Sequence, residues 1–259
     1  MTIRPPAVAG QFYPEQPDEL RQRVRQLLDQ APPPQITPKA IIAPHAGFIY
    51  SGPIAATAYR AVSKIADNIT RVILLGPSHH VALRGIALPE STQFQTPLGN
   101  IPLDLAAIAK ISTLSSVNVN AQAHTWEHSL EVQLPFLQLL LGEFQLVPLV
   151  VGEAQAEQTA DLLNILWGGD ETLIVVSSDL SHYHPYECAN ILDQATRHKI
   201  EMLSPELSGD QACGCQPING LLVAAQQHGL KVTTLDIRNS GDTAGSHERV
   251  VGYGAYALH

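Results

Sequence analysis

Apolar runs alternate with amphipathic segments along most of the chain. The runs at 40–43, 72–75 and 173–176 are wholly aliphatic, as expected for strands that are buried on both faces of a sheet. Between them, apolar residues recur at three- and four-residue spacing, the period of a helix with one buried stripe. Strands that alternate with helices in this way are typical of an α/β fold.

The pattern predicts the following order of elements. Helices are expected from Pro17 to about Leu28 and at 53–63, 103–111, 132–140, 154–167, 185–202 and 218–228. Strands are expected at 39–44, 71–75, 85–88, 117–119, 144–151, 172–177, 231–237 and 250–258, and residues 94–99 are expected to form a loop.

Three of the predicted strands end in a short loop that carries histidine or aspartate. His45 follows the first, His79 and His80 follow the second, and Asp179 and His182 follow the third. The carboxyl ends of parallel strands meet at one rim of an α/β sheet, where ligands and metals bind. We therefore expect these imidazoles and the carboxylate to share one crevice.

His45 and His79 are the first candidates for metal ligands, because each lies just after a proline at a strand end. Asp242 or Asp179 would add a carboxylate, although the Ser-Gly-Asp-Thr setting of Asp242 is equally typical of a turn. Two imidazoles and one carboxylate are the pattern of non-haem Fe(II) sites, and zinc or copper accepts similar ligands. His182 is a candidate acid or base, because imidazole titrates near neutral pH.

A second polar cluster begins the helix expected at 132–140. Glu127, His128 and Glu131 would lie at the N-terminal end of that helix, which favours anions and lowers the pKa of a histidine. We therefore count His128 as a candidate catalytic residue, together with His182 and Asp179.

Other chemistries have weaker signals. The sequence contains no glycine-rich dinucleotide fingerprint, no P-loop and no Gly-x-Ser-x-Gly elbow. A serine hydrolase built on Ser78, Ser177 or Ser178 is conceivable, but the tight spacing of its acid and base makes a triad awkward. Cys213-Gly214-Cys215 could bind a metal, but a lone Cys-x-Cys pair is a weak signal, and we expect both cysteines to be buried structural residues.

Composition narrows the class of protein. A chain of 259 residues, 45% of them hydrophobic, is expected to form a single domain over 1–259. The net charge of −9 argues against nucleic-acid or anionic-membrane partners, and no apolar run reaches the length of about 18 residues that a membrane crossing needs. Three cysteines, with no apolar leader at the N-terminus, fit reduced thiols and a cytoplasmic location.

Five ordered motifs carry a family resemblance across essentially the whole chain. They are Ala43-Pro44-His45-Ala46-Gly47, Leu75-Gly76-Pro77-Ser78-His79-His80, Glu127-His128-Ser129-Leu130-Glu131, Ser177-Ser178-Asp179-Leu180-Ser181-His182 and Cys213-Gly214-x-x-Pro217. Ala9-Gly10-Gln11-Phe12-Tyr13 and Gly252-Tyr253-Gly254-Ala255 fit as well. Together these motifs resemble the Memo family, whose bacterial and archaeal members are called AmmeMemoRadiSam system protein B.

The resemblance implies a fold similar to the class III extradiol dioxygenases, that is, a LigB-like three-layer α/β/α sandwich on a largely parallel or mixed sheet. By motif, His45 and His79 match the family's metal-ligand histidines, and Asp179 and His182 match other residues of its pocket. The resemblance implies a third ligand in the loop that holds Asp242. Animal members have a cysteine in that region, whereas this loop has none, which puts copper or thiolate chemistry in doubt here.

The function implied by the resemblance is a non-haem metal site, with Fe(II) expected first, in a dioxygenase-like oxidoreductase of unknown substrate. His45, His79 and Asp242 would hold the metal and His182 would act as the base. The alternative is a non-catalytic module that binds a peptide or protein in the same pocket. The family's system name also implies a radical SAM partner, and a homodimer is compatible with an acidic chain of this size.

Overall fold

The aliphatic strands lie side by side at the centre of one sheet. β2 (Ala40–Ala43) pairs in parallel with β9 (Thr172–Ser177), β9 pairs in parallel with β3 (Arg71–Pro77), and β3 pairs in parallel with β8 (Gln145–Val151). The register places Ala43 beside Ser177, so the loops that follow these strands begin at the same level of the sheet. The computed structural model describes residues 2–33 and 35–259.

Antiparallel strands complete a mixed nine-stranded sheet. β12 (Val250–Leu258) runs antiparallel to β2, to β10 (His182–His184) and to β11 (Val232–Asn239). On the other side, β4 (Ile86–Leu88) is antiparallel to β8 and parallel to β7 (Val117–Val119). The sheet is thus mixed, and its parallel centre carries the predicted site.

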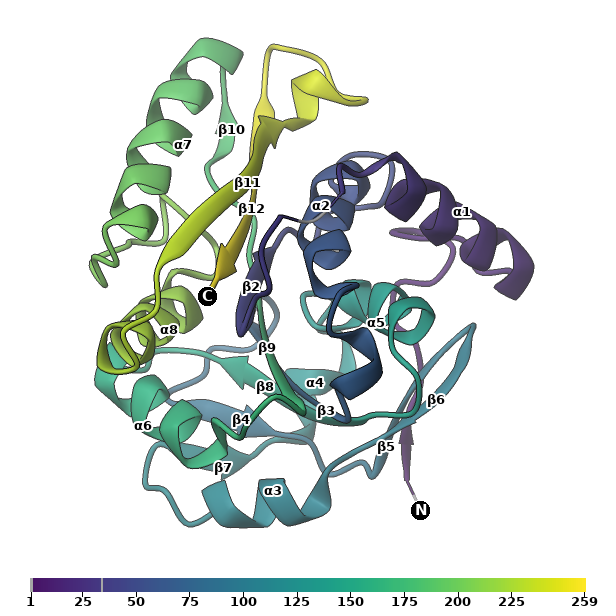
Figure 1. The fold of residues 1–259 in the computed structure, drawn as a ribbon, viewed down its shortest axis with the longest axis vertical. Helices are drawn as coiled ribbons and strands as arrows, with labels where there is room; N and C mark the ends of the chain where they lie inside the picture. The colour runs from purple at the N-terminus through teal and green to yellow at the C-terminus, as the bar shows by residue number, and fades with distance from the viewer. Residues whose placement is uncertain (1, 34) are drawn as a thin grey trace.

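Helices cover both faces of the sheet. α1 (Pro17–Gln30), α2 (Gly52–Val62) and α5 (Leu134–Leu140) pack against one another on one face, and α6 (Ala156–Leu166), α7 (Tyr186–Glu201) and α8 (Cys215–Gln227) cover the other (Figure 1). The shorter helices are α3 (Leu105–Ile111), α4 (Ala121–Thr125) and the 3₁₀ turns η1 (Ala66–Asn68), η2 (Glu131–Gln133) and η3 (Ser240–Asp242). The predicted three-layer α/β/α sandwich is confirmed.

Two local predictions differ from the structure. Residues 94–99 form a hairpin, not a loop: β5 (Gln93–Thr96) and β6 (Gly99–Pro102) pair, and β1 (Ile3–Arg4) joins them in a small second sheet. Gly99 accommodates the reversal with a φ of +128°. The helix expected at 132–140 begins at Leu134, because Pro135 has no N–H to donate and therefore fits only the first turn.

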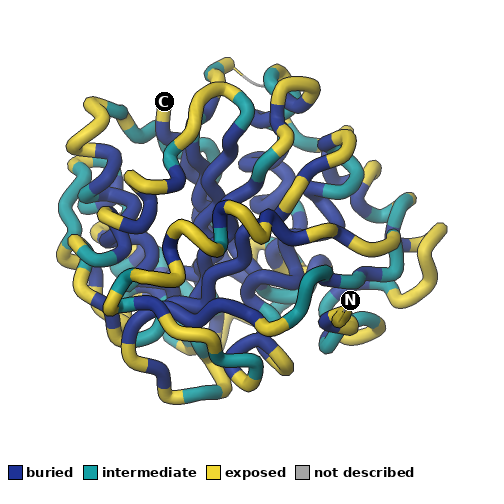
Figure 2. The backbone as a smooth tube through the Cα atoms, turned by 90° about the horizontal axis from the view of Figure 1, so that it is seen from below, coloured by how far each residue is buried: buried dark blue, intermediate teal, exposed yellow. Residues whose placement is uncertain are grey.

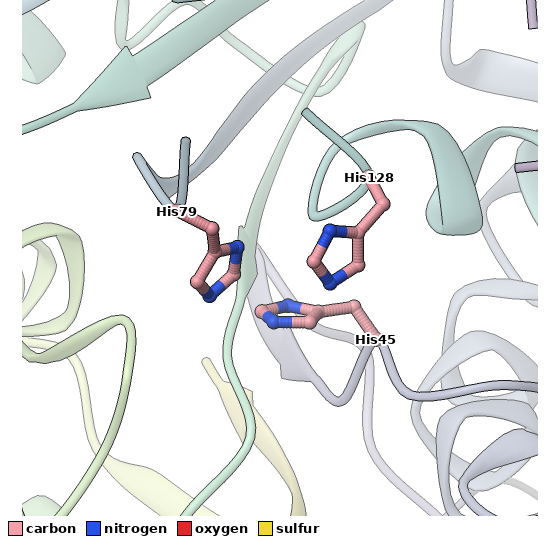
Figure 3. Close-up of side chains that lie close together, drawn as sticks. All are labelled: His45, His79 and His128. Atoms are coloured by element: carbon pink, nitrogen blue, oxygen red, sulfur yellow. The ribbon is translucent and has the colours of Figure 1, made fainter. Parts of the chain in front are cut away.

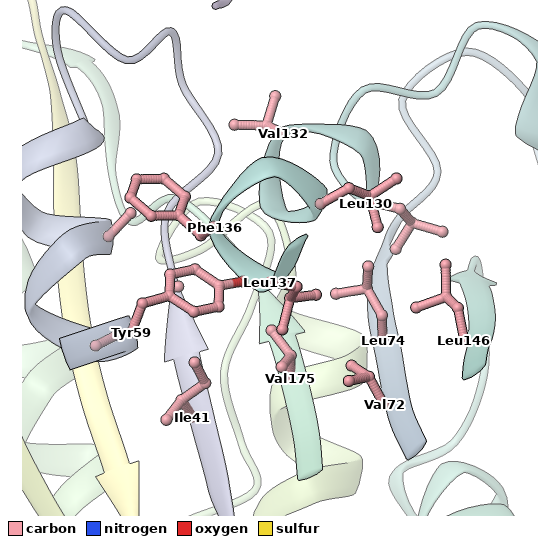
Figure 4. Packing of buried hydrophobic residues seen from close by; sticks show 14 of the residues in the cluster. Ile41, Tyr59, Val72, Leu74, Leu130, Val132, Phe136, Leu137, Leu146 and Val175 are labelled. Carbon is pink, nitrogen blue, oxygen red and sulfur yellow. The ribbon is translucent and has the colours of Figure 1, made fainter. Parts of the chain in front are cut away.

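Alternate residues of each central strand face opposite helix layers. Ile41 and Val175 face α2 and α5, where Tyr59 and Phe136 stack with ring centroids 4.9 Å apart (Figure 4). Ile42 and its neighbours on the other face pack against α6 and α8. Burial of each such side chain contributes about 1.5–3 kcal/mol to the free energy of folding. Figure 2 shows the buried centre enclosed by exposed turns.

Within 2–33 and 35–259, no helix combines the length and apolar character needed to cross a membrane.

Candidate metal centre

The predicted strand-end residues meet in one cleft of about 840 Å³. His45 follows β2, His79 follows β3, and Asp179 and His182 follow β9. All four line the cleft, together with Ala7, Val8, Gln11, Phe12, His80, Trp126, His128, Tyr183, His184, Gly209, Asp210 and Cys213. The parallel register of β2, β9 and β3 therefore brings together residues that are up to 137 positions apart, from His45 to His182.

Three imidazoles converge at the base of this cleft. His45, His79 and His128 each offer a ring nitrogen, and these nitrogens lie within 4.8 Å of one another (Figure 3). The rings of His79 and His128 stack with centroids 4.7 Å apart, and the ring of His45 stands edge-on to both. Such a group of three could hold a metal ion.

The hydroxyl of Ser177 fixes the proton of His45. Ser177 donates its only hydrogen to the carbonyl of Ser129 at 2.6 Å, and its oxygen accepts from Nε2 of Gln133 at 2.8 Å. The 2.8 Å contact between Ser177 Oγ and Nδ1 of His45 must therefore be donated by the ring. His45 then carries its lone pair on Nε2, and burial holds the pKa of His45 well below its usual value, so the ring is neutral.

A buried carboxylate holds His79 in the same way. Glu127 accepts the main-chain N–H of His79 at 2.6 Å and contacts Nδ1 of the ring at 2.8 Å. Burial alone would raise the pKa of Glu127, but the hydrogen bond and charge of His79 outweigh it and hold that pKa well below its usual range. For His79 the two effects have the opposite signs. Burial alone would lower the pKa of His79, but the hydrogen bond with Glu127 outweighs burial, so the pKa is raised. Nδ1 of His79 is therefore bound to Glu127, and Nε2 is the ring nitrogen that remains to bind a metal ion.

His128 lies in the loop between α4 and η2, near the same carboxylate oxygen that His79 contacts. Its Nδ1 is 3.6 Å from Oε1 of Glu127, and the ring of Phe12 packs against it with centroids 4.7 Å apart. Burial lowers the pKa of His128 to about 4. A neutral imidazole in this position is suited to bind a cation.

Asp179 is buried beside His45. One carboxylate oxygen accepts the main-chain N–H of His45 at 2.8 Å, and burial raises the pKa of Asp179 to about 6. His182 begins β10, where Nδ1 donates to the carbonyl of Leu180 at 2.8 Å and leaves Nε2 as an acceptor. The next residue, Tyr183, has a φ of +61° at an irregularity in the pairing of β10, and this allows successive side chains to line the cleft.

Asp242 is not brought to these histidines. It is an exposed residue at the end of the turn η3, where it accepts hydrogen bonds from the Tyr186 hydroxyl at 2.6 Å and the Asn239 main-chain N–H at 2.8 Å. It does not line the cleft. Asp242 is therefore a turn residue, as its Ser-Gly-Asp-Thr setting allowed. The side chain that converges with His45 and His79 is that of His128.

Cys213, for which the sequence favoured a structural role over metal binding, lines the same cleft. Its Sγ lies 3.4 Å from Nε2 of His45 and accepts the main-chain N–H of Asp179 at 3.3 Å. A thiol thus does reach the cleft, from the loop before α8, not from the loop of Asp242. Burial raises the pKa of Cys213, so the free thiol keeps its proton. The Cys213-Gly214 motif drew attention to this residue. Its spacing along the chain, however, could not predict a contact with His45, which follows a different strand.

Comparison with known proteins agrees with this architecture. A family model described as Memo-like protein matches residues 4–257. The chain belongs to the Memo family. A MEMO1 family protein from Aquifex aeolicus is 37% identical over 98% of both chains, and one from Sulfolobus acidocaldarius is 35% identical over 97% of both. An uncharacterized protein from Escherichia coli K12 shares the fold, with a TM-score of 0.52 and 13% identity over 83% of this chain and 98% of that one.

The donor set of this Memo-family protein suits a transition metal. Imidazole nitrogens and a thiol favour iron, zinc or copper, whereas magnesium and calcium require oxygen ligands. Two ligands of one tetrahedral ion, with metal–sulfur and metal–nitrogen bonds of about 2.3 and 2.0 Å, lie roughly 3.5 Å apart. The separation of 3.4 Å between Cys213 Sγ and His45 Nε2 agrees with this value. The residues present therefore fit a bound ion.

Proposed function

We propose that this Memo-family protein is a non-haem metal-dependent oxidoreductase that acts on a small molecule. His45 and His79 would hold a divalent ion, with His128 and Cys213 as the neighbouring donors. The observation that carries the proposal is the convergence of three ring nitrogens within 4.8 Å, two of them on rings whose Nδ1 is bound to an oxygen atom. Iron is the first choice because of the family's likeness in fold to ring-cleaving dioxygenases, which is an argument by analogy.

A bound ferrous ion would supply the electrons for reaction with O₂ and a Lewis acid for the substrate. The chain's own residues would handle the proton. Nε2 of His182 is free to accept a proton from a substrate hydroxyl, because Nδ1 is committed to the carbonyl of Leu180. Asp179, with a pKa of about 6, would orient the main chain at His45. Phe12 packs against His128 at one side of the cleft and would restrict the access of water to that ring.

Metal content tests the first part of the proposal. Protein purified without chelator or affinity-tag metal should contain close to one iron per chain. His45→Ala and His79→Ala should each lose it. Asp242→Asn is the matched control and should retain it, because Asp242 lies outside the cleft. Absence of bound metal under all loading conditions, with both alanine variants folded, would refute the metal site.

Turnover tests the second part. Oxygen uptake by the iron-loaded protein would be screened with catechol-type compounds. His182→Ala should lower the rate by about 10²–10⁴-fold while metal content stays unchanged. Equal loss of metal and of activity would instead assign His182 to the metal site.

A peptide-binding module is the second candidate, and one observation favours it. Trp126 and Tyr183 line the cleft with relative exposures of 65% and 62%. Exposed aromatic side chains of this size are typical of protein interaction surfaces. Peptide binding that survives removal of metal, and is lost in Trp126→Ala, would favour this module over an enzyme.

A further inference from the structure

One buried carboxylate connects the N-terminal segment to the candidate metal centre. Glu131 is fully buried in η2, three residues after His128. Its carboxylate accepts four hydrogen bonds, all from the segment Arg4–Tyr13. The donors are the Arg4 guanidinium, the main-chain N–H groups of Ala7 (2.8 Å) and Val8 (3.0 Å), and the Tyr13 hydroxyl (2.6 Å).

Arg4 extends this connection to the loop that carries His128. Besides the ion pair with Glu131, its guanidinium donates to the carbonyl of His124 at 2.9 Å and to the carbonyl of Glu127 at 2.6 Å. Arg4 is itself buried. Arg4 therefore binds the main chain on the N-terminal side of His128. Glu131, on the C-terminal side of His128, binds Arg4 and the segment that follows it.

The segment held in this way forms part of the cleft wall. Ala7, Val8, Gln11 and Phe12 all line the cleft. The ring of Phe12 packs on His128, and the carbonyl of Phe12 accepts the main-chain N–H of Phe48 at 2.7 Å. Among the described residues before α1, from Thr2 onward, the only helix or strand is the short strand Ile3–Arg4. These polar contacts act together with the apolar packing of Val8 and Tyr13, which are both buried in the core.

We infer that Glu131 is a positioning residue for the candidate metal centre, which fixes the Arg4–Tyr13 segment as a cleft wall and thereby sets the place of His128. This inference rests on the proposed metal function. Glu131 joins the two segments that meet at His128, because it belongs to the turn after His128 and binds four groups of the Arg4–Tyr13 segment.

The test measures binding of Co²⁺ by competition with a chelator, together with the visible absorption of the bound ion, which reports the ligand geometry. Glu131→Gln should weaken Co²⁺ binding by about 10–100-fold and shift the absorption, as loss of a residue supporting a ligand does. Tyr13→Phe removes one of the four hydrogen bonds and should weaken binding by a smaller factor.

Asp104→Asn is the control for the loss of a buried carboxylate that forms an ion pair far from the cleft. Asp104 binds Arg71 at 2.7 Å at the N-terminal end of β3, opposite to the end that leads to His79. This variant should unfold at a lower temperature, with Co²⁺ affinity and absorption unchanged.

Two outcomes would overturn the inference. One is a folded Glu131→Gln protein with wild-type affinity and absorption. If Glu131→Gln does not fold, Tyr13→Phe decides, and an unchanged affinity and spectrum in that variant would refute the positioning role. Failure of the metal proposal would look different, because the wild type and His45→Ala would then bind Co²⁺ equally.

Discussion

Glu127 binds His79 twice, at the main-chain N–H and at Nδ1 of the ring, with distances of 2.6 and 2.8 Å. This pairing orients the imidazole and strengthens Nε2 as a donor. Glu127→Gln keeps the size of the side chain and removes the charge. We expect metal affinity to fall by about 10–100-fold in this variant, measured by chelator competition.

The exposed residue Glu153 provides the control for Glu127. Glu153→Gln changes net charge by the same amount and should leave affinity unchanged. Equal affinities of the two variants would contradict the supporting role of Glu127.

The thiol of Cys213 gives a spectroscopic prediction. Its sulfur lies 3.4 Å from Nε2 of His45, and a metal deprotonates a coordinating thiol despite the raised pKa of the free group. Co²⁺-loaded wild-type protein should therefore show an intense near-ultraviolet band from sulfur-to-cobalt charge transfer. Cys213→Ser should lose this band, while Cys188→Ser, at an exposed cysteine, should keep it. A wild-type spectrum without the band would remove Cys213 from the ligand set.

Gly214 allows the loop of Cys213 to approach β9. A Cβ atom at this position would lie 2.6 Å from Cβ of Ser178 and 2.9 Å from the carbonyl oxygen of Ser177. Gly214→Ala should therefore lower the free energy of unfolding by about 1–3 kcal/mol, measured in urea, and should weaken metal binding because the thiol moves away from His45. Gly142→Ala meets no atom within 4 Å and should change neither quantity.

His124 should make stability fall in weak acid. Its Nε2 donates to the carbonyl of Ala87 at 2.9 Å, and burial lowers its pKa to about 4, against about 6.5 in the unfolded chain. Since the folded pKa is the lower one, the unfolded state binds a proton first, and the stability present at pH 7 is lost as the pH falls below about 6.5. Between pH 7 and pH 5 this effect amounts to about 2 kcal/mol.

Urea unfolding at pH 7 and pH 5 measures the contribution of His124. His124→Gln keeps an N–H donor for Ala87 and has no group that titrates in this range. The loss of stability between the two pH values should be smaller in this variant by about 2 kcal/mol. An identical pH dependence in both proteins would contradict the burial effect.

Local patterns in the sequence were sufficient to predict the layers and half of the candidate site. The aliphatic runs identify β2, β3 and β9, and the parallel order of such strands places His45 and His79 at one rim. His128 was assigned to the site for its position at a helix start, whereas in the structure it lies in the loop before η2. The pairing of Cys213 with His45 joins positions 168 residues apart, and no local spacing encodes such a contact.

Asp242 is a residue that the sequence proposed for the site and that lies outside the cleft. A carboxylate in a loop after a strand was a reasonable ligand, but its oxygens accept hydrogen bonds from Asn239 at the start of its own turn and from Tyr186 of α7. The hairpin at 93–102 was missed for a similar reason, because Pro97 and Gly99 are equally compatible with an open loop.

The three imidazoles come from positions 45, 79 and 128, and they meet only when β2 and β3 are aligned through β9. An unfolded chain therefore has no equivalent site, and an ion that binds the folded protein shifts the unfolding equilibrium by mass action. At a free metal concentration 100 times the Kd, this linkage amounts to about 2.7 kcal/mol. Metal supply would then set how long the protein persists in a cell, in addition to any reaction that it performs.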